Sequence, residues 1–187
     1  MITVRFLAFP EYHKYLEFMK SQDKETRRMY FGVTMANECL DSLYENILDH
    51  KTYHRFIVAE DETFNVVGVL HLAEMDQRAI EIGIAVDRAY RSKGVGSQMM
   101  DLAIPWCRNR SHNEVYMHCL AYNEPVMKLV KKYKLKISTT YGDADAKVVL
   151  PPASPSTIVE EAFIIQQQGV RRWASNLAGW YKMFQTH

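Results

Sequence analysis

One segment constrains the fold of this chain more than any other: a strand pattern that leads through a glycine loop directly into a helix pattern. Residues 80–86 (IEIGIAV) are apolar, and residues 95–109 have helical spacing, although Pro105 predicts a kink or an early end of that helix. Glycine is scarce, 8 of 187 residues, yet Gly94 and Gly96 both fall in the connecting loop. Backbone N–H groups at a helix start lack intrahelical partners and carry partial positive charge, which suits this loop to binding phosphate groups.

Two basic side chains add positive charge to the same loop, residues 91–97 (RSKGVGS). Arg91 and Lys93 precede the first of its two glycines. The spacing is neither GxxxxGK[ST] nor GxGxxG, so the loop matches neither the P-loop nor the Rossmann fingerprint. An ordinary glycine-containing turn is the structural alternative, but two glycines and two basic residues at one helix start favour anion binding.

The patterns around the loop predict a mixed α/β domain. Residues 55–60, 66–73 and 79–86 have the composition of strands and are separated by polar turns, which predicts an antiparallel meander. A further strand is predicted at residues 114–120, after the helix over 95–109. The order strand, helix, strand predicts a parallel pair of strands joined by a helical crossover.

The remaining segments complete one domain. A strand is expected over residues 3–9, a helix after Pro10 and another helix over 35–49. Asn123 has the position of an N-cap, which predicts a helix to about residue 133. The chain then has the pattern of a closing hairpin, with residues 136–141 and 146–150 as its strands and Gly142-Asp143 between them.

A proline cluster separates the tail from the rest of the chain. Pro151, Pro152 and Pro155 mark this boundary, which predicts one domain over residues 1–150 and a helical extension over residues 151–187. Gly169 is a candidate break between two helices of the extension. Its apolar residues recur at helical spacing: Val159, Ala162, Phe163, Val170, Trp173, Leu177, Trp180, Tyr181 and Phe184.

The composition excludes several classes of protein. Lys+Arg 23 against Asp+Glu 22 gives a net charge of +1, so no charge field indicates nucleic-acid binding. No apolar run reaches the ~18 residues of a membrane span, and the N-terminus lacks a signal-peptide pattern, so we expect a cytoplasmic protein that does not use a membrane. Three cysteines without a CxxC pair, and His50 and His54 without an acidic partner in pattern, predict neither disulfides nor a metal site.

The pattern Arg-x-x-Gly-x-Gly after a strand resembles the acyl-CoA pyrophosphate loop of the GNAT acetyltransferases. The resemblance extends over residues 60–150, because a strand, Asn123 and a helix follow the loop in the family's order. Residues 26–31 (TRRMYF) also resemble a segment of bacterial Pat-type protein lysine acetyltransferases. The resemblance implies the GNAT fold, an α/β (α+β) architecture with a mixed central sheet of about six to seven strands flanked by helices.

The resemblance also implies that acetyl-CoA is the co-substrate and indicates how it binds. Family members bind it between two splayed parallel strands, so the backbone of Ile84, Ala85 and Val86 would pair with the pantetheine arm. Asn123 would bond to the same arm or cap the following helix. The pyrophosphate would be held by the loop residues Arg91, Ser92, Lys93, Gly94, Val95, Gly96 and Ser97.

Glu81 is the expected general base. An attacking ammonium must lose a proton, which a carboxylate can take directly or through water. On a strand, Glu81, Gly83 and Ala85 share one face, and the small residues on this face leave room for a thioester, whereas Ile82 and Ile84 face the core. Pat-type enzymes carry a glutamate at the matching position. The alternative is a sheet glutamate paired with a lysine or an arginine.

The general acid departs from the family pattern. Many GNAT enzymes carry a tyrosine in the helix after the asparagine, and it protonates the departing thiolate; Val130 occupies that place here. Tyr133, later in the same helix, is the candidate acid, with a packing role as the alternative. CoA thiolate is a tolerable leaving group, so the reaction does not require an acid.

The resemblance implies transfer of an acetyl group to a primary amine by direct attack on the thioester. The Pat-type similarity favours a protein lysine as acceptor, with a small amine as the alternative. A non-catalytic CoA-binding module that recruits a partner is a further alternative, because the family tyrosine is absent and the tail is long and aromatic. The tail is expected to pack on the core or to form a homodimer interface.

Overall fold

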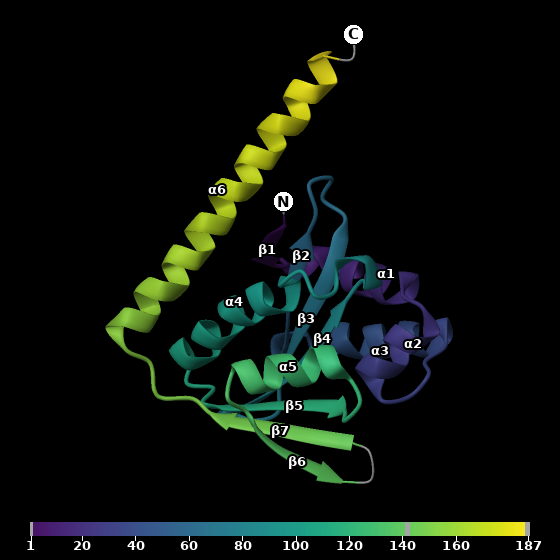
Figure 1. Ribbon diagram of the computed structural model, residues 1–187, viewed down its shortest axis with the longest axis vertical. Helices are drawn as coiled ribbons and strands as arrows, with labels where there is room; N and C mark the ends of the chain where they lie inside the picture. Colours follow the sequence, from purple (N-terminus) through teal and green to yellow (C-terminus); the bar gives the residue numbers. More distant parts are fainter. Residues whose placement is uncertain (1, 141–142, 186–187) are drawn as a thin grey trace.

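The computed structural model describes residues 2–140 and 143–185, and the side chains of 139–143 and of 175 onward lie outside its described part (Figure 1). The elements run from a short N-terminal strand to a long C-terminal helix. In chain order they are β1 (Thr3–Phe6), η1 (Phe9–Glu11), α1 (His13–Ser21), α2 (Lys24–Phe31), α3 (Asn37–Asp49), η2 (Lys51–Tyr53), β2 (His54–Glu60), β3 (Val66–Glu74), β4 (Ala79–Val86), η3 (Arg88–Tyr90), α4 (Val95–Asn109), β5 (Glu114–Leu120), α5 (Glu124–Lys132), β6 (Lys136–Thr140), β7 (Asp143–Val149) and α6 (Pro155–Gln185).

The described strands form one seven-stranded sheet in the order β1-β2-β3-β4-β5-β7-β6. Neighbouring strands are antiparallel except β4 and β5, which are parallel and are joined by α4. The predicted meander, the predicted crossover and the mixed sheet of about six to seven strands are therefore confirmed.

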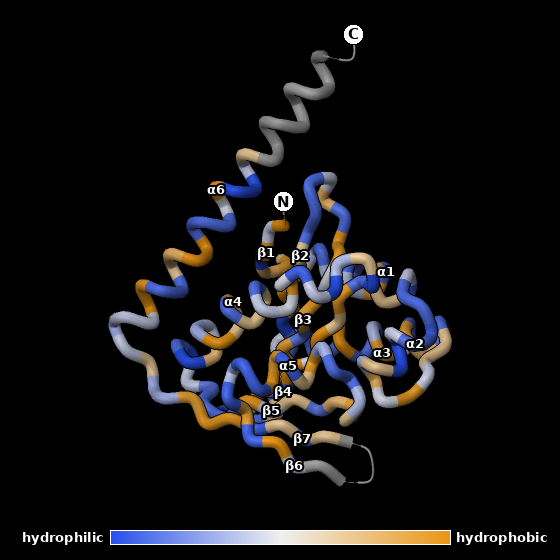
Figure 2. Tube along the Cα trace, in the orientation of Figure 1, coloured by the Kyte–Doolittle hydropathy of each residue, from blue (hydrophilic) through white to orange (hydrophobic). Residues whose placement is uncertain are grey.

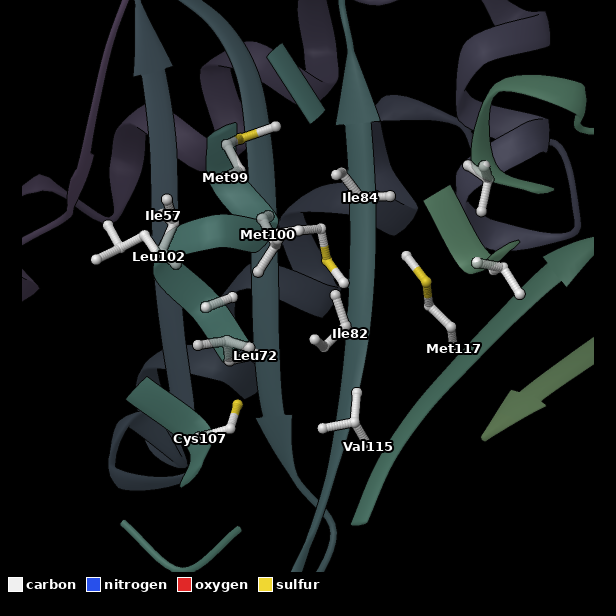
Figure 3. Packing of buried hydrophobic residues seen from close by; sticks show 14 of the residues in the cluster. Ile57, Leu72, Ile82, Ile84, Met99, Met100, Leu102, Cys107, Val115 and Met117 are labelled. Atoms are coloured by element: carbon white, nitrogen blue, oxygen red, sulfur yellow. The ribbon is translucent and has the colours of Figure 1, made fainter. Parts of the chain in front are cut away.

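Helices cover both faces of the sheet. Apolar side chains of α4, among them Met99 and Met100, pack against Leu72 of β3 and Ile82 of β4 (Figure 3). The opposite face packs against α1 and α3, where Tyr15 is 2% exposed. Each strand alternates between the two faces, so both layers draw apolar residues from the same strands.

Most local predictions hold, but the first strand ends at Phe6 and not at Phe9, and three further segments differ from the prediction. The extension is one helix, α6, which continues through Gly169, so the candidate break there was wrong. A lone glycine costs a helix only about 1 kcal/mol, which a long helix tolerates. α4 likewise continues through Pro105 to Asn109. The helix α2 was not predicted, because KETRRMYF has too few apolar residues to show a helical period.

The long helix α6 runs along the outside of α4 and past β1 (Figure 1). The described residues include no helix that is long and apolar enough to cross a membrane. The turn of the predicted hairpin, at Gly142, lies outside the described residues, as do the tail side chains of Leu177, Trp180, Tyr181 and Phe184.

Candidate active site

The two parallel strands of the sheet separate along their length. β4 and β5 pair only at Ala79↔Glu114, Ile80↔Val115 and Glu81↔Tyr116, although β4 continues to Val86 and β5 to Leu120. Beyond Glu81 the edge of β4 that would face β5 has no ladder partner on that strand. The backbone groups there are available to a ligand that inserts between the strands.

A cavity of about 330 Å³ lies where the strands separate. Its walls include Ile84, Ala85 and Val86 from β4, Arg91 from the loop and Asn123 from the start of α5. The structure therefore brings together three groups of residues that the sequence resemblance named separately. The helix α2 closes the cavity with Thr26, Met29 and Tyr30.

The glycine loop forms a second, adjoining cavity of about 170 Å³, lined by Arg91, Ser92, Gly94, Val95 and Gly96. Gly94 is the N-cap of α4 with φ of +79°, a left-handed conformation that suits glycine. A Cβ on Gly96 would lie 3.0 Å from the Leu129 side chain, so this position allows α5 to pack closely against α4.

The other members of the predicted loop lie differently. Lys93 is placed with its ammonium 5.4 Å from the centre of the Tyr90 ring, and Ser97 directs its carbonyl oxygen to the Tyr133 hydroxyl at 2.9 Å. Neither residue lines the loop cavity. Lys128 of α5 does line the loop cavity and adds a positive charge there.

Arg91 is held in place by two hydrogen bonds. Its Nε donates to the Val86 carbonyl oxygen at 3.0 Å, and its Nη2 donates to Thr26 Oγ1 at 2.5 Å. The guanidinium thereby bridges the end of β4 and the helix α2, and it lines both cavities. A guanidinium with a fixed orientation can bind a phosphate oxygen without first losing side-chain freedom.

Asn123 caps the helix α5. Its Oδ1 accepts a hydrogen bond from the Val126 N–H at 3.4 Å, and the residue is 9% exposed. Capping was one of the two roles open to this residue. Because Asn123 also lines the 330 Å³ cavity, the cap places it beside the space between the strands.

Glu81 lines a third cavity, of about 250 Å³, on the face of the sheet covered by α1 to α3. The carboxylate is exposed, and among the described residues it forms no ion pair. The alternative of a structural pair with a lysine or arginine therefore has no support in the described part of the chain. Tyr30, Phe31, Leu43, His71 and His118 line the same cavity.

Tyr30 of α2 separates the cavity of Glu81 from the cavity between the strands, because it lines both. Its hydroxyl lies against β4, where a Cβ on Gly83 would be only 2.8 Å from the oxygen. The hydroxyl is buried beside that of Tyr15 and has no hydrogen-bond partner of good geometry. Burial raises the pKa of Tyr30 well above its usual value, so the hydroxyl keeps its proton. Sequence analysis missed this residue, since its helix was not predicted.

Tyr133, the candidate general acid, lies outside the three cavities. It follows the last residue of α5, and its hydroxyl contacts the Ser97 carbonyl oxygen at 2.9 Å and Asp101 Oδ1 at 2.5 Å. Burial and the Asp101 carboxylate raise the pKa of Tyr133. The residue lines none of the three cavities and connects α5 to α4. Val130, at the family position of the acid, is fully buried.

His71 lines the third cavity and contacts a second histidine, His54. The Nε2 atom of His71 and the Nδ1 atom of His54 share a hydrogen bond of 2.9 Å, and the His71 ring stacks on Phe56. Burial, and then the neighbouring His54, lower the pKa of His71 to about 3, so it is neutral at pH 7. In the part of the chain that is described, no cluster of three or more His, Cys, Asp or Glu residues could hold a metal ion.

The chain was compared with known families and structures. The sequence model of the acetyltransferase (GNAT) family matches residues 16–134, which is well over half of the chain. No curated protein sequence matches significantly.

Solved structures resemble the fold at low sequence identity. Spermidine N-acetyltransferase from Vibrio cholerae, crystallised with CoA and spermine, is 18% identical with a TM-score of 0.63, and the match covers 80% of this chain and 95% of that one. The GNAT domain of S. lividans PAT is 12% identical with a TM-score of 0.65 and coverage of 79% and 89%. An N-acetyltransferase from Staphylococcus aureus Mu50 is 17% identical with a TM-score of 0.61 and coverage of 81% and 99%.

Proposed function

Because the chain belongs to the acetyltransferase (GNAT) family, we propose that it transfers the acetyl group of acetyl-CoA to a primary amine, with a protein lysine side chain as the acceptor. The separation of β4 from β5 beyond Glu81 is the observation that carries this proposal. It leaves a cavity that adjoins the glycine loop, and Tyr30 lies between this cavity and the cavity that Glu81 lines.

Acetyl-CoA would enter with its phosphates at the glycine loop. The free N–H groups of the first turn of α4, from Val95, bind the pyrophosphate together with the fixed guanidinium of Arg91. The pantetheine arm pairs with the free edge of β4 at Ile84 to Val86, beside Asn123. The thioester then lies near Gly83, the point at which the strands have just separated.

The amine attacks the thioester carbon directly. The new N–C bond forms as the C–S bond breaks, and the electron pair of that bond leaves with the CoA thiolate. Glu81 accepts the proton that the ammonium loses before attack, directly or through water, and the second proton that the nitrogen loses as the amide forms passes to the CoA thiolate. Tyr30, whose protonated hydroxyl lies against Gly83, donates a hydrogen bond to the thioester as negative charge develops there. Tyr133 has no part in these steps, because it lines none of the cavities.

The lining of the third cavity favours a lysine over a polyamine. Glu81 is the only carboxylate among the described residues that line it. Tyr30, Phe31 and Leu43 offer apolar contact to an aliphatic chain, and one carboxylate meets one ammonium. A polyamine carries several ammonium groups, each of which would need a polar partner when buried.

The test is acceptor-dependent release of CoA from acetyl-CoA, followed with a thiol reagent. A lysine-rich protein, spermidine and a mixture of other small amines are compared as acceptors. Release with the lysine-rich protein supports the proposal, and release with spermidine alone refutes the lysine assignment. CoA binding, measured by thermal shift, without turnover on any acceptor favours the non-catalytic module instead.

A further inference from the structure

In contrast to an ordinary surface helix, α6 turns a mainly polar face toward the domain and an apolar face toward solvent. The face toward the domain is polar: Thr157 Oγ1 donates to Asn109 Oδ1 at 2.8 Å, and Glu161 accepts from Arg110 at 2.9 Å. About two turns further on, Gln168 Oε1 accepts a hydrogen bond from the Val4 N–H of the edge strand β1 at 2.9 Å. These contacts satisfy polar groups of the domain, and among the described apolar residues of α6 only Ile164 packs against the core.

The opposite face of α6 is apolar and exposed. Val159, Phe163, Val170 and Trp173 are 67%, 56%, 61% and 64% exposed. Successive residues of a helix are about 100° apart, so Phe163 points away from Glu161 by nearly half a turn. Figure 2 shows apolar and polar positions alternating along the helix beside α4. Surface helices normally direct their apolar stripe toward the core, so this face requires another partner.

The apolar residues follow a seven-residue repeat, which we call the α6 seam. Its members with described side chains are Val159, Phe163, Gln166, Val170 and Trp173, and the sequence continues the same steps of four and three residues at positions 177, 180 and 184. Alternating steps of four and three are the a and d positions of a coiled coil, and the apolar stripe of an ordinary amphipathic helix is wider. The repeat therefore indicates that the partner is itself a helix with the same repeat.

We propose that the α6 seam is a dimerisation surface and that its occupant is α6 of a second copy of this chain. In a dimer of identical helices the flanking e and g positions of one copy lie beside those of the other, so like charges at these positions would repel. Only Glu160 is charged among the flanking e and g positions from 160 to 176, which are Glu160, Ala162, Gln167, Gly169, Ala174 and Asn176. Coiled coils that select a different partner usually do so with charges at these positions.

The geometry of the domain permits this dimer. Each domain binds α6 through the face opposite the seam, so two paired helices would carry their domains on outer sides. Gln166 is the one polar member of the seam, and a single polar residue in such a seam fixes the register of the two helices. The tail therefore packs on the core through one face and pairs through the other.

The test is the mass of the full chain in solution, by sedimentation equilibrium at micromolar concentration. We expect twice the 21.8 kDa of the chain. Phe163→Glu should give a folded monomer. Ile158→Glu is the matched control, because Ile158 is 57% exposed on the same helix but lies outside the seam, and this variant should remain a dimer.

Three results would overturn the proposal: a monomeric wild type, a Phe163→Glu variant that is as dimeric as the wild type, or an Ile158→Glu variant that dissociates equally. A wild type that is monomeric but sediments with phospholipid vesicles would assign the seam to a membrane surface. Circular dichroism of each variant distinguishes dissociation from unfolding. Acetyl transfer is measured separately, so a failure of this proposal leaves the proposed function standing.

Discussion

Glu81 of β4 lies opposite Tyr116 of β5, and this is the last pair at which the two parallel strands stay together. The position gives Glu81 two neighbours of different kinds. On the side toward the loop the strands have separated, and on its own face of the sheet a cavity opens to α2 and α3. The carboxylate therefore lines the cavity proposed for the acceptor amine, and Tyr30 lies between it and the cavity between the strands.

Replacing Glu81 by glutamine should lower kcat by about 10²- to 10⁴-fold, because the amide cannot accept the proton. The KM for acetyl-CoA should change little, since Glu81 lies outside the donor cavity. Steady-state kinetics with a saturating acceptor measures both. Glu74→Gln, on the neighbouring strand β3 and the opposite face, is the control and should retain activity. An active Glu81→Gln enzyme would remove this residue from the mechanism.

Tyr30→Phe separates a catalytic hydroxyl from a structural one. Loss of a hydrogen-bond donor to the reacting group should reduce kcat by about 10²-fold. The free energy of unfolding should stay the same or rise by about 1 kcal/mol, because the hydroxyl is buried without a well-formed partner. Urea denaturation beside the kinetics provides both values. A less stable variant with normal kcat would show that the hydroxyl has only a structural role.

Gly83→Ala should reproduce the kinetic defect of Tyr30→Phe. The added Cβ would lie 2.8 Å from the Tyr30 oxygen and 3.0 Å from its Cζ, so the ring must move away from β4. Once the ring is displaced, removing its hydroxyl should have little further effect on kcat. The double variant Gly83→Ala with Tyr30→Phe tests this, and fully additive losses would mean that the two residues act independently.

Arg91→Ala should raise the KM for acetyl-CoA about ten- to a hundredfold, the usual cost of a lost hydrogen bond to a charged group. Acetyl-pantetheine has no pyrophosphate, so its KM should be nearly the same for wild type and variant. Arg88→Ala, in the exposed turn before the loop, is the control. An equal increase in KM for both donors would place the arginine away from the phosphates.

Arg5→Ala should destabilise the domain by about 2–3 kcal/mol, because it removes the closest partner of a buried carboxylate and leaves only the more distant Lys14 and Arg172 beside it. The Glu60 side chain is 0% exposed and receives Arg5 Nη2 at 2.7 Å. Lys20→Ala is the control, since the Lys20–Asp41 pair lies on the surface and should contribute less than about 1 kcal/mol. Chemical denaturation at pH 7 measures both, and equal losses would contradict the assignment.

His71 should make the protein less stable in mild acid. Its pKa is about 3 in the fold against 6.5 ordinarily, so below pH 6.5 the unfolded chain binds a proton that the folded chain does not. Stability is therefore full above pH 6.5 and falls as the pH is lowered toward 3. The pH dependence of Tm should be shallower in His71→Gln and unchanged in His13→Gln, on the surface of α1. An unchanged slope in His71→Gln would contradict the prediction.

The parts that the sequence predicted are the local ones. The glycine loop leads directly into α4, and Asn123 caps α5, because each feature depends on a few neighbouring residues. The faces of β4 followed from alternation alone: Ile82 lies in the core, and Glu81 lies on the other face beside a cavity.

The features that the sequence did not predict depend on contacts between residues that are distant in the sequence. Tyr30 reaches Gly83 only because α2 folds over β4. Tyr133 could not be placed by counting from Asn123, because α5 ends there and Lys134 adopts a φ of +58°, which turns the chain away. The polar inner face of α6 likewise depended on its partners in the domain, since spacing shows a stripe but not the direction it faces.

The central claim is that an acceptor amine attacks acetyl-CoA directly and that Glu81 takes its proton. Acetyl-CoA labelled with carbon-13 in the acetyl group, incubated with the enzyme and a lysine-rich protein, tests this by mass spectrometry. We expect label on lysine side chains in proportion to the CoA released, and no label on the enzyme during turnover. The Glu81→Gln variant should lose acetyl transfer and still bind CoA. Label on an enzyme cysteine as an intermediate, or transfer by Glu81→Gln at the wild-type rate, would contradict it.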